Sequence, residues 1–334
     1  MSDRLNTLLA VDNISKNFPM KSEHGPDRIL RAVDGISFNV VPGEVVGIVG
    51  ESGCGKSTLG KTIIRIYEPD DGSLQWKGED LTQFKGEKLK RIRKNMQMIF
   101  QDPYSSLNPR KKICDIIGQP MRVHRVCSPD EITERTDAMM REVGINPLYG
   151  RRYPHQFSGG QRQRIGIARA LVLNPDFVVC DEAVSALDVS VQAQILNLLL
   201  DLEDRYGFAN LFISHDLSVV EFIAKRILVM YLGRIVEKAP KIELMSEPLH
   251  PYTRALLAAF PNADPAAARS QKKQIVVGDV PSPLNPPTGC HFHPRCPLAS
   301  DRCREVYPPL VEVAPGREVA CWEIGGNAGL RFTQ

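Results

Sequence analysis

The sequence lacks any apolar run near the ~20 residues that a membrane-spanning helix needs, although 43% of its 334 residues are hydrophobic. Its first residues, MSDRLNTLLAVDN, lack the apolar core of a signal peptide. The net charge of +3 is too small to indicate nucleic-acid binding by itself, and no internal repeat is visible. We therefore expect a cytosolic chain, peripheral to any membrane, with one large domain and an appendage.

Apolar runs alternate with helical patterns along most of the chain, which predicts an α/β fold with a mainly parallel sheet. We expect strands at 8–11, 36–40, 44–50, 73–81, 96–101, 176–182 and 210–216, helices from Lys56 and at 189–206 and 217–225, a basic amphipathic stretch at 85–95, and a hairpin at 226–238 around Leu232-Gly233. Residues 112–157 show no strand pattern, and 128–144 begins with a capping serine and early acids. This region is predicted to be a helical insert, and the Pro-, Ala- and Cys-rich chain beyond about 262 a C-terminal appendage.

Residues 50–57 (GESGCGKS) fit the phosphate-loop pattern G-x-x-x-x-G-K-[ST] between a strong strand and an expected helix. The glycines let backbone N–H groups converge on phosphate oxygens. Lys56 supplies positive charge for the β- and γ-phosphates, and Ser57 a hydroxyl for Mg²⁺. A glycine-rich turn without a ligand is the alternative, and the strand–helix context disfavours it. The residues expected to bind nucleotide here are Gly50, Glu51, Ser52, Gly53, Cys54, Gly55, Lys56, Ser57 and Thr58.

A second candidate feature is the apolar strand FVVC, which ends in Asp181 and Glu182. Burial of that strand would bring both carboxylates to the C-terminal edge of the sheet, beside the phosphate loop. Asp181 suits the Mg²⁺ shell, and Glu182 suits polarising the attacking water. Two solvated loop acids are the alternative.

A third feature, FSGGQ at 157–161, precedes an expected helix. Ser158 suits a helix N-cap, and the two glycines permit close approach of an anion. Taken alone, a plain capped helix explains this stretch better than a phosphate site.

Together, these features resemble the ATP-binding cassette (ABC) transporter ATPases over nearly all of residues 8–260. The matching order is the phosphate loop, Gln101 after an apolar strand, FSGGQ, Asp181 and Glu182, residues 185–188 (SALD), and His215. The resemblance implies a P-loop NTPase nucleotide-binding domain with a RecA-like core, an antiparallel β-subdomain and a helical subdomain at about 102–170. Residues 1–261 would form this ATPase domain, and 262–334 a small Cys-rich extension.

The resemblance also implies roles for single residues. Phe18 would stack on adenine, with a core aromatic as the alternative. Gln101 would touch Mg²⁺ and sense the membrane partner, and His215 would contact the γ-phosphate; a surface glutamine and a capping histidine before Asp216 are the alternatives. The implied catalytic residues are Glu182, His215 and Gln101, and the implied Mg²⁺ ligands are Ser57, Gln101 and Asp181.

The signature motif would bind the γ-phosphate held by the opposite subunit, and Asp188 would lie at the dimer interface, with a helix N-cap as the alternative for Asp188. The signature residues are Ser158, Gly159, Gly160 and Gln161. This chain has Phe157 where Leu is usual and Ala183 where Pro is usual. Neither departure removes a phosphate ligand, so we expect both to have only modest effects on the ATP site.

Two further stretches, QDPYSSLNP at 101–109 and HPYTR at 250–254, are similar to the dipeptide/oligopeptide importer ATPases, which also serve nickel, glutathione and other small cargo. This resemblance implies ATP-driven import at the cytoplasmic face of a bacterial cell membrane. It implies a second, related ATPase subunit, two permeases and a periplasmic or extracellular solute-binding protein. The permeases would dock on the helical insert that the 101–109 loop opens, with a polar surface loop as the alternative for 101–109. Cargo choice would lie in those other chains, and no nucleic acid is expected.

Four of the eight cysteines, Cys290, Cys296, Cys303 and Cys321, crowd into the appendage. Zinc sites more often pair cysteines as C-x2–4-C, which fits this spacing poorly. Similar tails in the peptide-importer group carry a [4Fe–4S] cluster, so the resemblance implies one here. Zinc and unligated thiols stay open, as do His291 and His293 as alternative ligands. Because the tail is far in sequence from the ATP motifs, we expect a structural or assembly role for it.

Two other classes of protein compete with this interpretation. A DNA-maintenance ATPase would share the ATPase core, but zinc insertions, a second cassette and long coiled coils are not visible in the sequence. Its best basic patch comprises Lys85, Lys88, Lys90, Arg91, Arg93 and Lys94, which also suit a solvated helix face or anionic lipid. A nucleotide-gated binding module without catalysis is disfavoured by Glu182 and His215.

Overall fold

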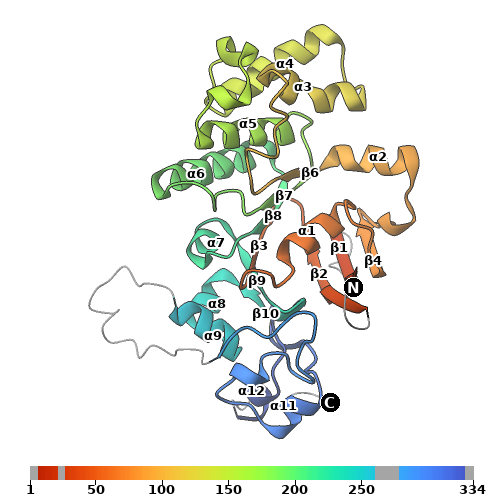
Figure 1. Ribbon diagram of the computed structural model, residues 1–334, viewed down its shortest axis with the longest axis vertical. Helices are drawn as coiled ribbons and strands as arrows, with labels where there is room; N and C mark the ends of the chain where they lie inside the picture. The colour runs from red at the N-terminus through yellow and green to blue at the C-terminus, as the bar shows by residue number, and fades with distance from the viewer. Residues whose placement is uncertain (1–6, 22–26, 260–277, 328–334) are drawn as a thin grey trace. The chain divides into compact units, whose positions relative to one another are not determined.

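The computed structural model describes residues 7–21, 27–259 and 278–327. The chain divides into two compact units, and Figure 1 labels most of their helices and strands. The first unit comprises Met1–Ala10, Asn39–Val45 and Leu74–Ile213, and the second comprises Val11–Phe38, Val46–Ser73 and Ser214–Gln334. The domain boundary expected between residues 261 and 262 lies outside the described residues.

Parallel strands form the core of the first unit: β6 (Met96–Ile99), β7 (Phe177–Asp181) and β8 (Ala209–Ile213). Strand β7 pairs with both of its neighbours, and every residue of β7 and β8 is buried. Continuous apolar strands are typical of parallel sheets that are covered on both faces. Helix α6 (Val189–Tyr206) has the predicted bounds. The strands predicted at 96–101, 176–182 and 210–216 are confirmed as β6, β7 and β8 to within a few residues.

A helical insert follows β6, as predicted. It contains α3 (Ile113–His124), α4 (Pro129–Glu142), the 3-10 turns η3 (Pro147–Arg151) and η4 (Pro154–Gln156), and α5 (Gly159–Leu171). Helix α4 begins with a capping box, in which Ser128 and Glu131 satisfy each other's backbone N–H groups. Helix α3 packs against both α4 and α5, so the insert has a helix–helix core of its own.

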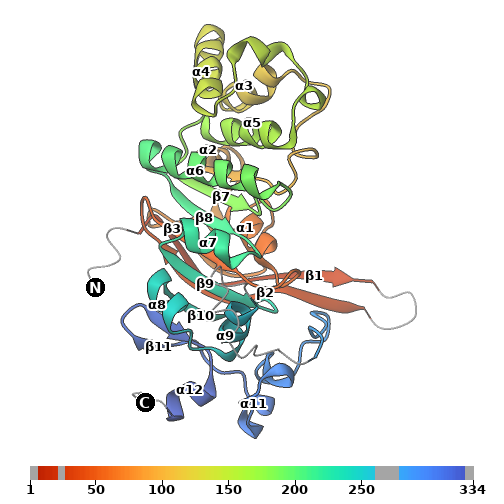
Figure 2. The same cartoon turned by 90° about the vertical axis from the view of Figure 1, so that its left-hand side faces the viewer.

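Strands β1 (Leu9–Met20) and β2 (Arg28–Val40) are longer than the sequence predicted, and Figure 2 shows them as a long ribbon. The shorter strands β4 (Asp71–Trp76) and β5 (Glu79–Asp80) follow later in the chain. The single strand expected at 73–81 is wrong, because β4 and β5 form a hairpin. Its turn residues Lys77 and Gly78 both have positive φ, the geometry that two-residue hairpin turns favour. After the hairpin come the short η2 (Leu81–Gln83) and α2 (Gly86–Asn95), which carries most of the basic patch.

In the second unit, β3 (Val45–Val49) pairs in parallel with β9 (Arg226–Tyr231), and β9 forms a hairpin with β10 (Arg234–Pro240). The predicted turn is confirmed, since Leu232 and Gly233 have φ values of 41° and 82°. The helices of this unit up to residue 259 are α1 (Lys56–Ile63), α7 (Leu217–Ile223), α8 (Lys241–Ser246) and α9 (Pro251–Ala258). Among the described residues, no helix is long and apolar enough to cross a membrane.

The extension at 278–327 belongs to the same unit as the phosphate loop, and its ordered elements were not predicted. It contains η5 (His293–Arg295), α11 (Asp301–Glu305), β11 (Val311–Ala314), β12 (Arg317–Val319) and α12 (Trp322–Asn327). Strand β12 pairs with β10, and β11 pairs with β12. Val319 and Ile324 pack against Leu249 just before α9. The appendage therefore continues the sheet of this unit.

Candidate nucleotide-binding site

The predicted phosphate loop lies between β3 and α1, in the expected strand–loop–helix context. Gly55 is the N-cap of α1 with a φ of 102°, and a Cβ there would lie 1.9 Å from the carbonyl oxygen of Ala32. Gly50 is equally crowded, because its Cβ would lie 2.1 Å from the carbonyl oxygen of Met230. Only glycine fits these two positions, so the loop packs closely on its own unit.

Lys56 is the buried cation of this loop, with an exposed fraction of 4%. Its Nζ donates hydrogen bonds to the carbonyl oxygens of Gly50 at 2.7 Å and Glu51 at 2.9 Å. Ser57 and Thr58 are half-buried in the first turn of α1, and Cys54 is buried beside Lys56. Ser52 and Gly53 are exposed at the tip of the loop. A lysine held this way presents a fixed positive charge at a helix N-terminus, which suits phosphate binding.

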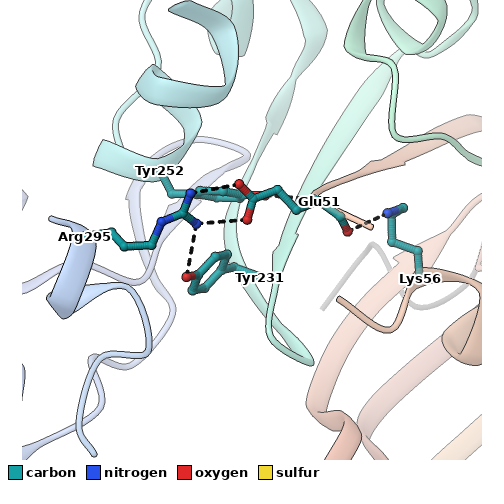
Figure 3. Close-up of polar contacts among 5 residues, drawn as sticks. All are labelled: Glu51, Lys56, Tyr231, Tyr252 and Arg295. Carbon is teal, nitrogen blue, oxygen red and sulfur yellow. Dashed lines mark hydrogen bonds and ion pairs between the residues drawn. The ribbon is translucent and has the colours of Figure 1, made fainter. Parts of the chain in front are cut away.

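Glu51 makes contacts that the sequence did not reveal. Its backbone N–H donates to the Oη of Tyr252 at 2.9 Å, and its carboxylate accepts from both terminal nitrogens of Arg295 (Figure 3). Tyr252 belongs to the HPYTR stretch, where His250 caps α9 by accepting from the Tyr252 N–H. Burial lowers the pKa of His250 to about 3, so the capping imidazole is neutral. HPYTR thus supports the phosphate loop directly.

Phe18 and His215 belong to the same unit as the phosphate loop. Phe18 is half-buried on β1, with its ring edge-to-face with Tyr67 at 5.4 Å, so it is not a fully buried core aromatic. His215 is exposed. The N-cap of α7 is Asp216, whose carboxylate accepts from the Ser218 N–H at 2.9 Å. His215 is therefore not the residue that caps α7, and the alternative explanation for it, a capping histidine, is wrong.

In the first unit, Gln101 and Glu182 meet directly. The Nε2 of Gln101 donates to the Glu182 carboxylate at 2.9 Å. Asp181 is the last residue of β7 and is 3% exposed, whereas Glu182 is half-buried just after the strand. Glu182 has a φ of 46°, a left-handed conformation that costs non-glycine residues on the order of 1–3 kcal/mol and that clusters at functional sites. The strand-end acids and Gln101, all predicted site residues, are thus close together in this unit.

The FSGGQ stretch forms the N-terminus of α5, with Ser158 as the predicted N-cap. Ser158 Oγ accepts from the Gln161 N–H, and the Gln161 side chain accepts from the Ser158 N–H at 3.0 Å. A Cβ on Gly160 would lie 2.5 Å from Val191, so helix packing also requires this glycine. Phe157 is 5% exposed, which shows that the unusual aromatic fills a buried apolar position. Ser158 itself is exposed and remains available to a ligand.

Asp188 occupies the N-cap position of α6, but its side chain makes no capping hydrogen bond. Asp188 is exposed, and the next residue, Val189, is 82% exposed. Capping therefore does not explain the carboxylate.

The four appendage cysteines come from separate segments of the extension. The Cys290 N–H donates to the Cys303 carbonyl at 2.8 Å, and η5 joins Cys290 to Cys296. Burial, with smaller contributions from the thiols of Cys303, Cys321 and Cys296, raises the pKa of Cys290 to about 12. Burial, with smaller contributions from Cys321 and Cys303, likewise raises the pKa of Cys296 to about 11. The electrostatic effect of each thiol therefore reaches the others.

The two histidines of this segment point elsewhere. His291 is buried, faces Tyr307 with ring centroids 5.1 Å apart, and lies near Arg234 and Asp34. His293 makes a 2.9 Å hydrogen bond to the Cys290 carbonyl. All eight cysteines are free thiols. Among the described residues, no group of three or more His, Cys, Asp or Glu side chains has the spacing of a metal-ion site.

Comparisons with known proteins define the class. The family model described as "ABC transporter" matches residues 33–185, and the one described as "Oligopeptide/dipeptide transporter, C-terminal region" matches residues 236–303. The solved dimeric structure of the ATP-binding cassette MJ0796, in a post-hydrolysis state bound to ADP and Pi, is similar with a TM-score of 0.63 and 27% identity, over 70% of this chain and 98% of that one. The fold is that of an ABC ATPase cassette.

Relatives at high identity narrow the class. The oligopeptide transport ATP-binding protein AppF of Bacillus subtilis is 49% identical over 94% of this chain and 97% of that protein. The "Probable peptide ABC transporter ATP-binding protein y4tS" of Sinorhizobium fredii is 51% identical over 96% of this chain and 90% of that protein. The chain therefore belongs to the ATP-binding subunits of the oligopeptide/dipeptide ABC transporter family.

Proposed function

We propose that this chain hydrolyses ATP to energise the import of oligopeptides, dipeptides or a related small solute through a membrane ABC transporter. The observation that carries the catalytic part is the 2.9 Å hydrogen bond between Gln101 and Glu182, at a strained position beside a buried aspartate. Glu182 polarises the attacking water, and Gln101 orients the Glu182 carboxylate and reports on the membrane partner. His215, exposed and not used for capping, contacts the γ-phosphate.

The phosphate loop binds the nucleotide, and its chemistry fits Mg²⁺-ATP. Lys56 supplies charge to the β- and γ-phosphates. The hydroxyl of Ser57, the amide of Gln101 and the carboxylate of Asp181 are the hard oxygen donors that Mg²⁺ prefers, and the metal would neutralise charge on the phosphates. Phe18, half-buried and edge-to-face with Tyr67, stacks on adenine. Residues 1–261 act as the ATPase domain, with the helical subdomain at about 102–170.

The chain works as half of an ATP sandwich with a related, distinct ATPase subunit. Two observations support this: Ser158 is exposed at the start of α5, and Asp188 is exposed without a capping bond. The relative MJ0796 is described as a dimer bound to ADP and Pi. Each nucleotide would then lie between the phosphate loop of one chain and the signature motif of the other.

Purified alone, the chain is expected to be monomeric and slow in ATP hydrolysis, because no single copy completes either site. Molar mass from light scattering and phosphate release, each with and without the second ATPase and the permeases, check this. Hydrolysis by the isolated chain as fast as by the complete transporter would exclude the requirement for a partner.

The other partners are two permeases and a solute-binding protein outside the membrane, and the chain works at the cytoplasmic face of the bacterial cell membrane. The loop after Gln101 is exposed at Tyr104, 65% of which is accessible, which suits contact with a permease.

The alternative function, DNA maintenance, has less support from the structure. Lys88 and Lys90 of the basic patch pair with Glu79 and Glu87, which reduces the free positive charge available to a phosphate backbone.

Cys290, Cys296, Cys303 and Cys321 hold one [4Fe–4S] cluster that fastens the extension. Four cysteine thiolates are the usual ligands of such a cluster, and the two histidines nearby face other groups. The other three thiols each raise the pKa of Cys290, but no group of three or more of the described His, Cys, Asp or Glu side chains is arranged as a metal-ion site in this structure. A cluster bound there would cross-link the segments that carry the cysteines and would couple metal binding to folding of the extension.

Protein purified without oxygen is expected to be brown, with absorption near ~400 nm and about four irons per chain. Cys303→Ser should lose most of the iron, whereas Cys127→Ser, a half-buried cysteine outside the extension, should keep it. Iron analysis and absorption spectra check both variants. Colourless protein, with stoichiometric zinc or without metal, would refute the cluster and leave the ATPase assignment intact.

A further inference from the structure

An ion pair joins the cysteine-rich extension to the phosphate loop. The terminal nitrogens of Arg295 donate to the two carboxylate oxygens of Glu51 at 3.0 and 3.1 Å (Figure 3). The Arg295 side chain is only 8% exposed, and Nη1 also reaches the Oη of Tyr231 at 3.4 Å. The carboxylate of Glu51 is half-buried, with 30% of its side chain exposed. A bidentate pair between a buried guanidinium and a half-buried carboxylate fixes both distance and direction, unlike a fully exposed salt bridge.

Glu51 connects Arg295 to Lys56, the lysine assigned to phosphate binding. Its carboxylate is held by Arg295, its N–H by Tyr252, and its carbonyl oxygen accepts from Lys56 Nζ at 2.9 Å. The backbone of the loop is therefore fixed on both sides of the Glu51 Cα. Any rotation of Glu51 would move the carbonyl that positions the Lys56 ammonium.

Arg295 is itself held rigidly. It is the last residue of η5, and Phe292 before that turn is 1% exposed. The Phe292 ring packs against Tyr231 and Tyr252, each with ring centroids 5.4 Å apart. Arg295 directly precedes Cys296, one of the four cysteines of the extension. The guanidinium is thus presented by a packed anchor, as a positioning group needs to be.

We propose that Arg295 is a positioning residue for ATP binding: it acts through Glu51 to hold the phosphate loop and Lys56 in place, and it neutralises an anion beside the phosphate site. The extension therefore sets nucleotide affinity, beyond any role in assembly. The inference rests on the assignment of residues 50–58 as the ATP-binding loop.

The role of Arg295 as a counterion predicts a specific pattern of ATP affinities among its variants. If Arg295 is removed alone, the Glu51 carboxylate stays in the loop without its counterion and opposes the ATP phosphates. If Glu51 is also changed to Gln, that opposition disappears. The double variant should then bind ATP better than Arg295→Met alone, which a merely structural role would not produce.

The test measures ATP affinity of the full-length chain by equilibrium titration, with thermal unfolding as a check on folding. Arg295→Met should weaken ATP binding roughly tenfold, and Glu51→Gln with Arg295→Met should recover about threefold of that loss. The matched control is Arg317→Met. Arg317 also ties the extension to its own unit, through Glu247, and is 14% exposed, but it does not touch the loop. We expect its ATP affinity to change less than about twofold.

Should Arg295→Met fail to fold, Arg295→Lys keeps the charge and loses the bidentate geometry, and an intermediate affinity is expected. Unchanged affinity in the Arg295 variants, an equal loss in Arg317→Met, or a double variant no better than Arg295→Met would overturn the inference. Failure of the unmodified chain to bind ATP would instead count against the site assignment itself.

Discussion

Glu182→Gln is expected to keep ATP binding and to lose ~10²–10⁴-fold of the ATP turnover of the assembled transporter. Glutamine has the shape of glutamate and can still accept the hydrogen bond from Gln101. It cannot polarise or deprotonate water, because its amide is not a base. Lys56 and the rest of the phosphate loop are unchanged, so the substrate should still bind.

Steady-state phosphate release gives the turnover of this variant, and equilibrium titration gives its ATP affinity. Glu87→Gln is the control, since Glu87 is 79% exposed in its side chain on α2 and has no place in the site. Near-normal ATP hydrolysis by the complex that carries Glu182→Gln would rule out Glu182 as the general base.

Lys56→Ala should show the opposite pattern and weaken ATP binding roughly 10- to 100-fold, as expected when a buried charged hydrogen-bond donor is removed. Lys56 also braces the carbonyl groups of Gly50 and Glu51, so its loss loosens the loop as well. Titration with ATP measures the effect, and Lys88→Ala on exposed α2 serves as the control. Full ATP affinity in Lys56→Ala would show that the loop is not the phosphate site.

Local patterns predicted the parts of the fold that local chemistry determines. The phosphate loop, the buried strand before Asp181, the capping serines Ser128 and Ser158 and the bounds of α6 each depend on neighbouring residues alone. The β4–β5 hairpin was missed because Lys77 adopts a positive φ, which is uncommon for lysine and gives no apolar signal.

Long-range contacts could not be predicted in this way. Strands β11 and β12 are short and carry no clear alternation, and they are strands because β10 offers an edge to pair with. Arg295 is 244 positions from Glu51, so nothing in the sequence around either residue indicates that they meet. The expectation that the tail serves only structure or assembly depended on that distance in sequence, whereas the fold places Arg295 on the phosphate loop.

The most direct test of the central claim is ATP-dependent uptake of a radiolabelled peptide into vesicles that contain the permeases, the solute-binding protein, the second ATPase and this chain. The unmodified chain is predicted to support peptide uptake when ATP is supplied on the side of the membrane to which the chain is bound. With Glu182→Gln, uptake should fall to the level without ATP while nucleotide stays bound. Uptake at the normal rate with Glu182→Gln, or with this chain omitted, would contradict its role as an ATP-hydrolysing motor of the importer.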